Sequence, residues 1–156
     1  MVKGDRKIQG SVAYVEQDPF IISDTLRANI LFGQEYDQQK FERVLKASQM
    51  DKDLQLFGYG IYTAIGERGV DLSGGQKARI SLARALYADA DIILLDDPLS
   101  AVDTKVARRI FDECIRGMLK NKIVVLVTHQ LQFLQECENI LLISDDGKVG
   151  AKGNLR

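Results

Sequence analysis

The chain has 156 residues, of which 46% are hydrophobic and 28% charged, enough to bury the core of one domain and too apolar for a disordered chain. Its net charge of -1 excludes a strong overall attraction to nucleic acid, and we expect no nucleic-acid partner. Cys114 and Cys137 have no metal-ligand spacing and are predicted to be reduced thiols, and no segment is long and apolar enough to span a bilayer.

The chain begins with a predicted strand over residues 7–16, in which apolar side chains partly alternate. Gln17 follows this strand directly. Pro19 disfavours helix at the residue before it, so we expect Phe20 to Ile22 to form an exposed apolar loop. Such a loop predicts a contact with a partner.

Two helices are predicted next. Ser23 or Asp24 is expected to cap a short helix that ends at Gly33, where glycine allows a left-handed residue. A longer helix over residues 37–50 follows, and residues 51–57 add a further helical turn. The inner face of the longer helix is expected to carry Phe41, Val44, Leu45 and Ala47.

A third helix is predicted after Ser73, whose side chain can cap it. Gly74 and Gly75 have no side chains, so the N–H groups of the first turn are expected to lie open to an anion. This pattern indicates a helix start that faces phosphate.

A buried strand over residues 92–95 is entirely apolar, as expected of a parallel strand covered on both faces. It leads into Asp96 and Asp97 at its carboxyl end. Ligands of open α/β sheets collect at such ends, so these carboxylates are candidate site residues.

The remainder of the chain alternates in the same way. A helix is predicted over residues 104–119, a second apolar strand over 123–127 that leads to His129, a short helix over 131–137 and a closing hairpin that starts at 139–144. The sequence therefore predicts an α/β fold with a largely parallel sheet and flanking helices.

Several of these segments resemble the motifs of an ATP-binding cassette. LSGGQ is similar to the signature motif, the strand ending in DD to the Walker B motif, and SAVD to the D-loop. Gln17 after YVE and His129 after VLVT occupy the expected order. The stretches QDPFIISDTLRANILFG, AIGERGVDLSGGQ and LDDPLSAVD resemble the first nucleotide-binding domain of C-subfamily, multidrug-resistance-associated exporters.

The resemblance implies ATP and Mg²⁺ as cofactors and assigns roles to four residues. Asp96 matches the carboxylate that holds the metal, and the amide of Gln17 is expected to reach the metal and the attacking water. His129 is expected to contact the γ phosphate. Asp97 stands where the family normally has a catalytic Glu, and this shorter side chain implies a site that binds ATP but hydrolyses it poorly.

The resemblance also implies that the signature motif completes the nucleotide site of a facing domain. Its residues are Leu72, Ser73, Gly74, Gly75 and Gln76. Ser100 and Asp103 are expected along the same domain interface. The implied partners are a second nucleotide-binding domain and the transmembrane domains of an exporter at the cytoplasmic face of a membrane.

The Walker A pattern G-x-x-x-x-G-K-[ST] does not occur in the chain. We therefore expect a partial nucleotide-binding domain, truncated before Walker A and inactive alone. Residues 1–17 and 88–156 are predicted to form the core sheet subdomain, and residues 18–87 a helical subdomain with the signature motif. Two alternatives remain open: a truncated, non-hydrolysing interaction module, and a cassette ATPase with no role in transport.

Overall fold

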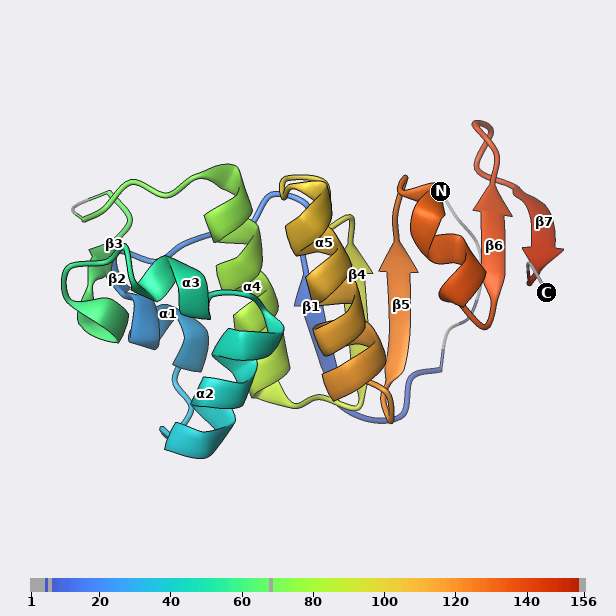
Figure 1. Ribbon diagram of the computed structural model, residues 1–156. Helices are drawn as coiled ribbons and strands as arrows, with labels where there is room; N and C mark the ends of the chain where they lie inside the picture. Colours follow the sequence, from blue (N-terminus) through green and yellow to red (C-terminus); the bar gives the residue numbers. More distant parts are fainter. Residues whose placement is uncertain (1–4, 6, 68, 155–156) are drawn as a thin grey trace.

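A three-stranded parallel sheet forms the centre of the fold. The computed structural model describes residues 5, 7–67 and 69–154. Strands β1 (Val12–Val15), β4 (Ile92–Asp96) and β5 (Ile123–Val127) pair in the order β1-β4-β5 (Figure 1). The predicted α/β fold with a parallel sheet is confirmed, although the first strand is shorter than the predicted 7–16.

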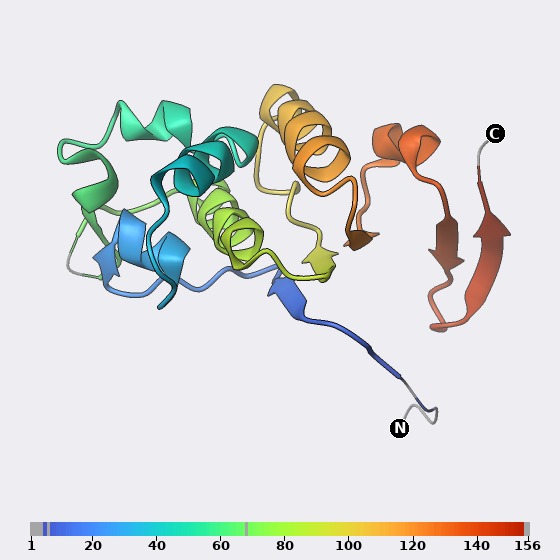
Figure 2. The ribbon, with the colours of Figure 1, turned by 90° about the horizontal axis from the view of Figure 1, so that it is seen from below.

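Helices pack against one face of this sheet. The long helix α4 (Gly74–Ala88) lies between the N-terminal helices and α5 (Thr104–Ile110), which continues as the π-helix η2 (Phe111–Met118). A short 3-10 helix, η3 (Leu131–Glu136), follows β5. Figure 2 shows these helices on the same side of the strands.

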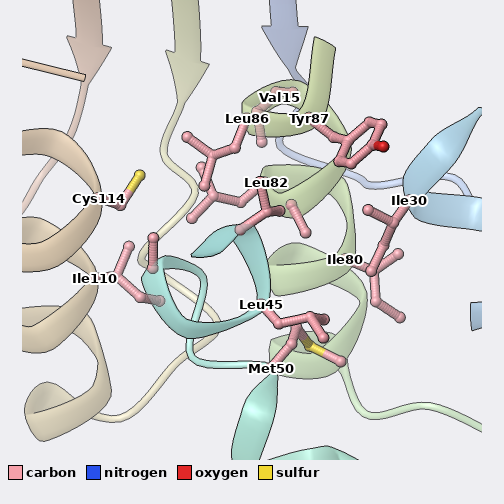
Figure 3. Close-up of a cluster of buried hydrophobic side chains, with 14 of the residues drawn as sticks. Val15, Ile30, Leu45, Met50, Ile80, Leu82, Leu86, Tyr87, Ile110 and Cys114 are labelled. Atoms are coloured by element: carbon pink, nitrogen blue, oxygen red, sulfur yellow. The ribbon is translucent and has the colours of Figure 1, made fainter. Parts of the chain in front are cut away.

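Helix α4 supplies the middle of the core. Figure 3 shows its Ile80 and Leu82 between Ile30 on one side and Ile110 and Cys114 on the other. All five side chains are almost fully buried, and burial raises the pKa of the Cys114 thiol to about 12. Both cysteines are free thiols, as predicted.

The prediction that the strand over residues 92–95 is covered on both faces is wrong. Ile93 and Leu95 are buried under the helices, whereas Ile92 and Leu94 on the opposite face are only half-buried. On the same open face, Val125 of β5 is exposed. Among the described residues no helix covers this face. The apolar side chains on this face of the strand are therefore not buried by the described part of the chain.

The N-terminal helical region contains several short elements beside the sheet. Helix α2 (Gln38–Ala47) buries the four predicted side chains, and its N-cap Asp37 accepts a hydrogen bond from the Lys40 backbone N–H. The elements are β2 (Asp24–Thr25), α1 (Leu26–Leu31), α2 (Gln38–Ala47), α3 (Asp51–Leu54), the 3-10 helix η1 (Gly60–Tyr62) and β3 (Ala64–Ile65).

The cap of α1 differs from the prediction. Thr25, and not Ser23 or Asp24, accepts the hydrogen bond from the Ala28 backbone N–H. The reason is that Asp24 and Thr25 pair as β2 with β3, some 40 residues further along the chain, which delays the helix start. The left-handed residue that caps the end of α1 is Phe32, with φ +44°, one position before the predicted Gly33, which also has a positive φ of +87°.

The apolar loop from Phe20 to Ile22 is less exposed than predicted. Only Phe20 is exposed, and its ring lies under the guanidinium of Arg84, 4.2 Å from ring centroid to Cζ. The buried Asn29 side chain binds both the N–H and the C=O of Ile22, which holds the loop against α1.

The predicted closing hairpin is present as β6 (Ile140–Ile143) and β7 (Val149–Gly153). It forms its own two-stranded sheet and does not extend the central one. Among the described residues, no helix is both long enough and apolar enough to cross a membrane.

Candidate nucleotide-binding site

Four predicted site residues lie at one edge of the central sheet. Asp96 ends β4 and Asp97 follows it, while Gln17 and His129 each stand two residues beyond the ends of β1 and β5. Because the three strands are parallel, their carboxyl ends meet at this edge. Asp97 is fixed to the neighbouring strand end by a 2.9 Å hydrogen bond from its N–H to the C=O of Val127.

Asp96 has a partner that the sequence analysis missed. The Tyr14 hydroxyl donates a 3.0 Å hydrogen bond to Oδ2 of Asp96, and this bond is the main cause that raises the pKa of Tyr14. Tyr14 pairs with Leu94, two residues before Asp96, so both side chains lie on the open face. The alternation along the two strands is the signal that could have found this pair.

Asp97 adopts an uncommon backbone conformation, with φ +48° in the left-handed region that Asp tolerates better than most residues. Asp97 is only 7% exposed, and its Oδ1 is buried with no hydrogen-bond partner among the described residues. An unpaired buried carboxylate oxygen costs about 1–3 kcal/mol or more. Such an atom points to a ligand or water that would complete its bonding.

These carboxylates fit a Mg²⁺ ion that is shared with phosphates. Mg²⁺ in nucleotide sites takes one or two carboxylates and completes its shell with water and phosphate oxygens. Asp96 keeps one carboxylate oxygen free of Tyr14 for the ion, whereas the unpaired Oδ1 of Asp97 is a second acceptor at the same strand end that could take a water. Among the described residues, no group of three or more His, Cys, Asp or Glu side chains is placed to hold a metal ion.

The start of α4 has the predicted cap. Ser73 is the N-cap, and its hydroxyl oxygen accepts a 3.2 Å hydrogen bond from the Gln76 N–H. Gln76 returns a bond, because its Oε1 accepts the Ser73 N–H at 3.0 Å. This reciprocal capping box holds the first turn rigid while Ser73 itself remains exposed.

The two glycines of this turn have different surroundings. Gly74 is exposed, and a Cβ there would only touch the Ala101 side chain at 3.8 Å. Gly75 is buried, and a Cβ would lie 2.8 Å from the Ala101 carbonyl oxygen. The Gly75 Cα hydrogen that a side chain would replace therefore faces the loop that follows β4, and only Gly74 has the open surroundings predicted for both.

The loop over residues 98–103 connects the strand end to α5. The Ser100 hydroxyl donates a 2.8 Å hydrogen bond back to the Asp97 carbonyl. Asp103 caps α5 by accepting the N–H groups of Lys105 and Val106. Both residues proposed for a domain interface thus also shape this loop.

His129 and Gln17 are exposed, and their side chains have no hydrogen bonds to the described residues. The residue after the histidine is engaged instead: Gln130 donates a 2.9 Å hydrogen bond from Nε2 to the Leu99 carbonyl. This bond, which the sequence analysis missed, joins the histidine loop to the loop over residues 98–103. Leu72, just before the cap, is buried and offers its backbone only.

Comparison with known proteins places these features in a family. The family described as ABC transporter matches residues 2–100. The chain is 56% identical over 94% of its length to human "ATP-binding cassette sub-family C member 4" and 49% identical over 99% to "ABC transporter C family member 9" of Arabidopsis thaliana. It is 50% identical over 97% to "Probable multidrug resistance-associated protein lethal(2)03659" of Drosophila melanogaster.

The chain spans only about a tenth of the length of these relatives, covering 11%, 10% and 11% of them. The family match covers more than half of the chain, and it coincides with the segment that contains the capped turn and both strand-end carboxylates. The chain therefore belongs to the ABC transporter family, whose members are ATP-binding transport proteins, and its resemblance to the C subfamily is confirmed.

Proposed function

We propose that this chain is part of a nucleotide-binding domain that binds MgATP at a domain interface and couples it to export through transmembrane domains. The observation that carries the proposal is the buried, unpaired Oδ1 of Asp97 at the carboxyl end of β4. This acceptor lies at the edge where α/β sheets bind ligands. The C-subfamily relatives support a place at the cytoplasmic face of a membrane.

At its own nucleotide, Asp96 and Gln17 would hold Mg²⁺ and His129 would donate a hydrogen bond to the γ phosphate. When bound, Mg²⁺ neutralises charge on the β and γ phosphates. Asp97 would orient the attacking water through Oδ1. Its side chain is one methylene shorter than Glu, and a misplacement of about 1 Å can cost about a hundredfold in rate.

The exposed capped turn would serve a second nucleotide, bound by the facing domain. Ser73 can donate its hydroxyl hydrogen outward, because its oxygen already accepts the Gln76 N–H. The first-turn N–H groups add the favourable end of the helix dipole for an anion. Leu72, Gly74 and Gly75 complete this turn, and Ser100 and Asp103 would lie along the same interface.

Variants of Asp97 test the function at the chain's own site. In the protein that contains this chain, Asp97→Glu is expected to raise steady-state ATP turnover several-fold at most, because the longer carboxylate reaches further but left-handed backbone suits Glu less than Asp. Asp97→Ala should change total turnover little, since the slow site contributes little. A complete absence of Mg²⁺-dependent ATP turnover in the unmodified protein would contradict the proposed function.

The contact with transmembrane domains would lie at a groove between two loops. The groove has a volume of about 360 Å³, and Pro19 and Ile21 line one side while Glu67, Asp71 and Lys77 add charges. The loops touch, because a Cβ at Gly66 would lie 3.0 Å from Ser23 Cα. Arg68, the other predicted member of this contact, lies outside the described residues.

Cysteine cross-linking tests this contact. Single cysteines at Ile21 and at Glu67 in the assembled protein are expected to cross-link to cytoplasmic loops of the transmembrane domains, because both residues line the groove. A cysteine at Glu42, on the outer surface of α2 and away from these loops, is the matched control and should not react. Equal yields at all three positions would contradict docking at the groove.

A further inference from the structure

Asp53 on helix α3 is a buried acid with three hydrogen-bond donors around it. The residue is only 8% exposed. Its Oδ1 accepts Nε2 of Gln76 at 3.0 Å, and its Oδ2 accepts Nε and Nη2 of Arg79 at 3.2 and 2.7 Å. Both partners belong to α4, so Asp53 joins α3 to the helix that begins with the capped turn.

The bond from Gln76 decides which way its amide points. The two ends of a glutamine amide have nearly the same shape, so hydrogen bonds select the orientation. With Nε2 directed at Asp53, Oε1 faces the Ser73 N–H and accepts it. A flipped amide would place a donor against the Ser73 N–H and an oxygen against the Asp53 carboxylate, and both contacts would repel.

Stability alone does not explain this arrangement. Apolar residues can replace a buried ion pair with little or no loss of stability, whereas they cannot orient an amide. Arg79 holds the carboxylate in place, since its side chain is also largely buried at 13% exposure. The pair therefore has the geometry of a support for Gln76, and through Gln76 for the Ser73 cap.

We propose that Asp53 is a positioning residue for the turn over Ser73 to Gln76: it acts through the Gln76 amide to keep the Ser73 hydroxyl and the first-turn N–H groups aimed at their ligand. That the ligand is a nucleotide phosphate rests on the proposed function. The positioning itself rests only on the hydrogen bonds among Asp53, Arg79, Gln76 and Ser73.

Hydrogen–deuterium exchange of the turn tests the positioning directly in the protein that contains this chain. Asp53→Asn keeps the shape of the side chain but replaces one carboxylate oxygen with an NH₂ group. The remaining oxygen is expected to face the charged Arg79, which leaves the NH₂ group against Gln76, so the Gln76 amide is no longer held in its present orientation. The Ser73 and Gln76 N–H groups are then expected to exchange about five-fold faster, the effect of a lost N-cap. Glu136→Gln is the matched control, because it also removes a carboxylate charge that is paired with arginine, here Arg108 and Arg116, but on a different part of the chain. It should leave exchange in the turn unchanged.

A second substitution separates positioning from a general loss of structure. Adding Gln76→Glu to Asp53→Asn lets a Glu carboxylate accept both the Ser73 N–H and an amide hydrogen of the new Asn, which should return exchange to near the original rate. Unchanged exchange in Asp53→Asn, an equal increase in Glu136→Gln, or no rescue by Gln76→Glu would overturn the proposal. If exchange behaves as expected but ATP turnover of Asp53→Asn stays unchanged, the positioning holds and the nucleotide assignment of the turn fails.

Discussion

Ser73→Arg is expected to abolish most ATP turnover. At the nucleotide that the capped turn is proposed to serve, the rate should fall by at least about a hundredfold, which is the usual effect of losing an aligned phosphate contact. Ser73 and Gly74 are the exposed residues of the turn over residues 72–76, whereas Leu72 and Gly75 are buried. Arginine removes the cap that accepts the Gln76 N–H and places its side chain where phosphate would bind. Steady-state turnover of the assembled protein measures the loss.

A cap variant elsewhere separates catalysis from stability. Asp37 caps α2 with a 2.8 Å hydrogen bond from the Lys40 N–H, and Asp37→Ala should cost about 1 kcal/mol of stability, as Ser73→Arg does through its own lost cap. Asp37→Ala should nonetheless leave turnover near its original value.

If Asp97→Ala proves as damaging as Ser73→Arg, the division into a slow and a fast site is wrong and this domain hydrolyses ATP in its own right.

Phe133→Ala is expected to lower the free energy of unfolding by about 3–5 kcal/mol, the usual cost of removing a buried aromatic ring. Phe133 is 1% exposed and stacks on Phe111 with ring centroids 4.4 Å apart. It anchors η3 to the π-helix η2 and thereby fixes the chain just after His129. Urea unfolding of the chain measures the change.

Leu131→Ala is the control for this variant, because Leu131 lies in the same short helix but is 72% exposed. Its substitution should change the free energy of unfolding by less than about 0.5 kcal/mol. Similar losses for the two variants would show that the helix, and not the stacked ring, determines the effect.

The features that sequence predicted well are those determined by local periodicity or local bonding. The apolar spacing of α2 and the Ser73 cap depend only on residues within a few positions, and both are confirmed. The edge that collects Asp96 and Asp97 could also be predicted, because parallel strands order their ends. The proposed roles of the site residues remain predictions.

The features that sequence missed depend on contacts between distant parts of the chain. The cap of α1 moved to Thr25 because a two-residue strand pairs with Ala64 and Ile65. The bond from Tyr14 to Asp96 requires the register of β1 against β4, and the left-handed backbone of Asp97 has no sequence signal. The support of Gln76 by Asp53 requires α3 to pack beside α4, which helix periodicity does not specify.

The close approach of Gly75 to the Ala101 carbonyl joins the start of α4 to the loop over residues 98–103, the two places proposed to serve different nucleotides. Ala101 directly follows Ser100, whose hydroxyl donates a hydrogen bond to the Asp97 carbonyl. A Cβ added at Gly75 would lie only 2.8 Å from the Ala101 carbonyl oxygen, so there is no space for a methyl group and the loop packs closely against the start of α4. Under the proposed function, a backbone movement at Asp97 would therefore be felt at the start of α4 through Ser100, Ala101 and Gly75, without any change in the nucleotide bound there.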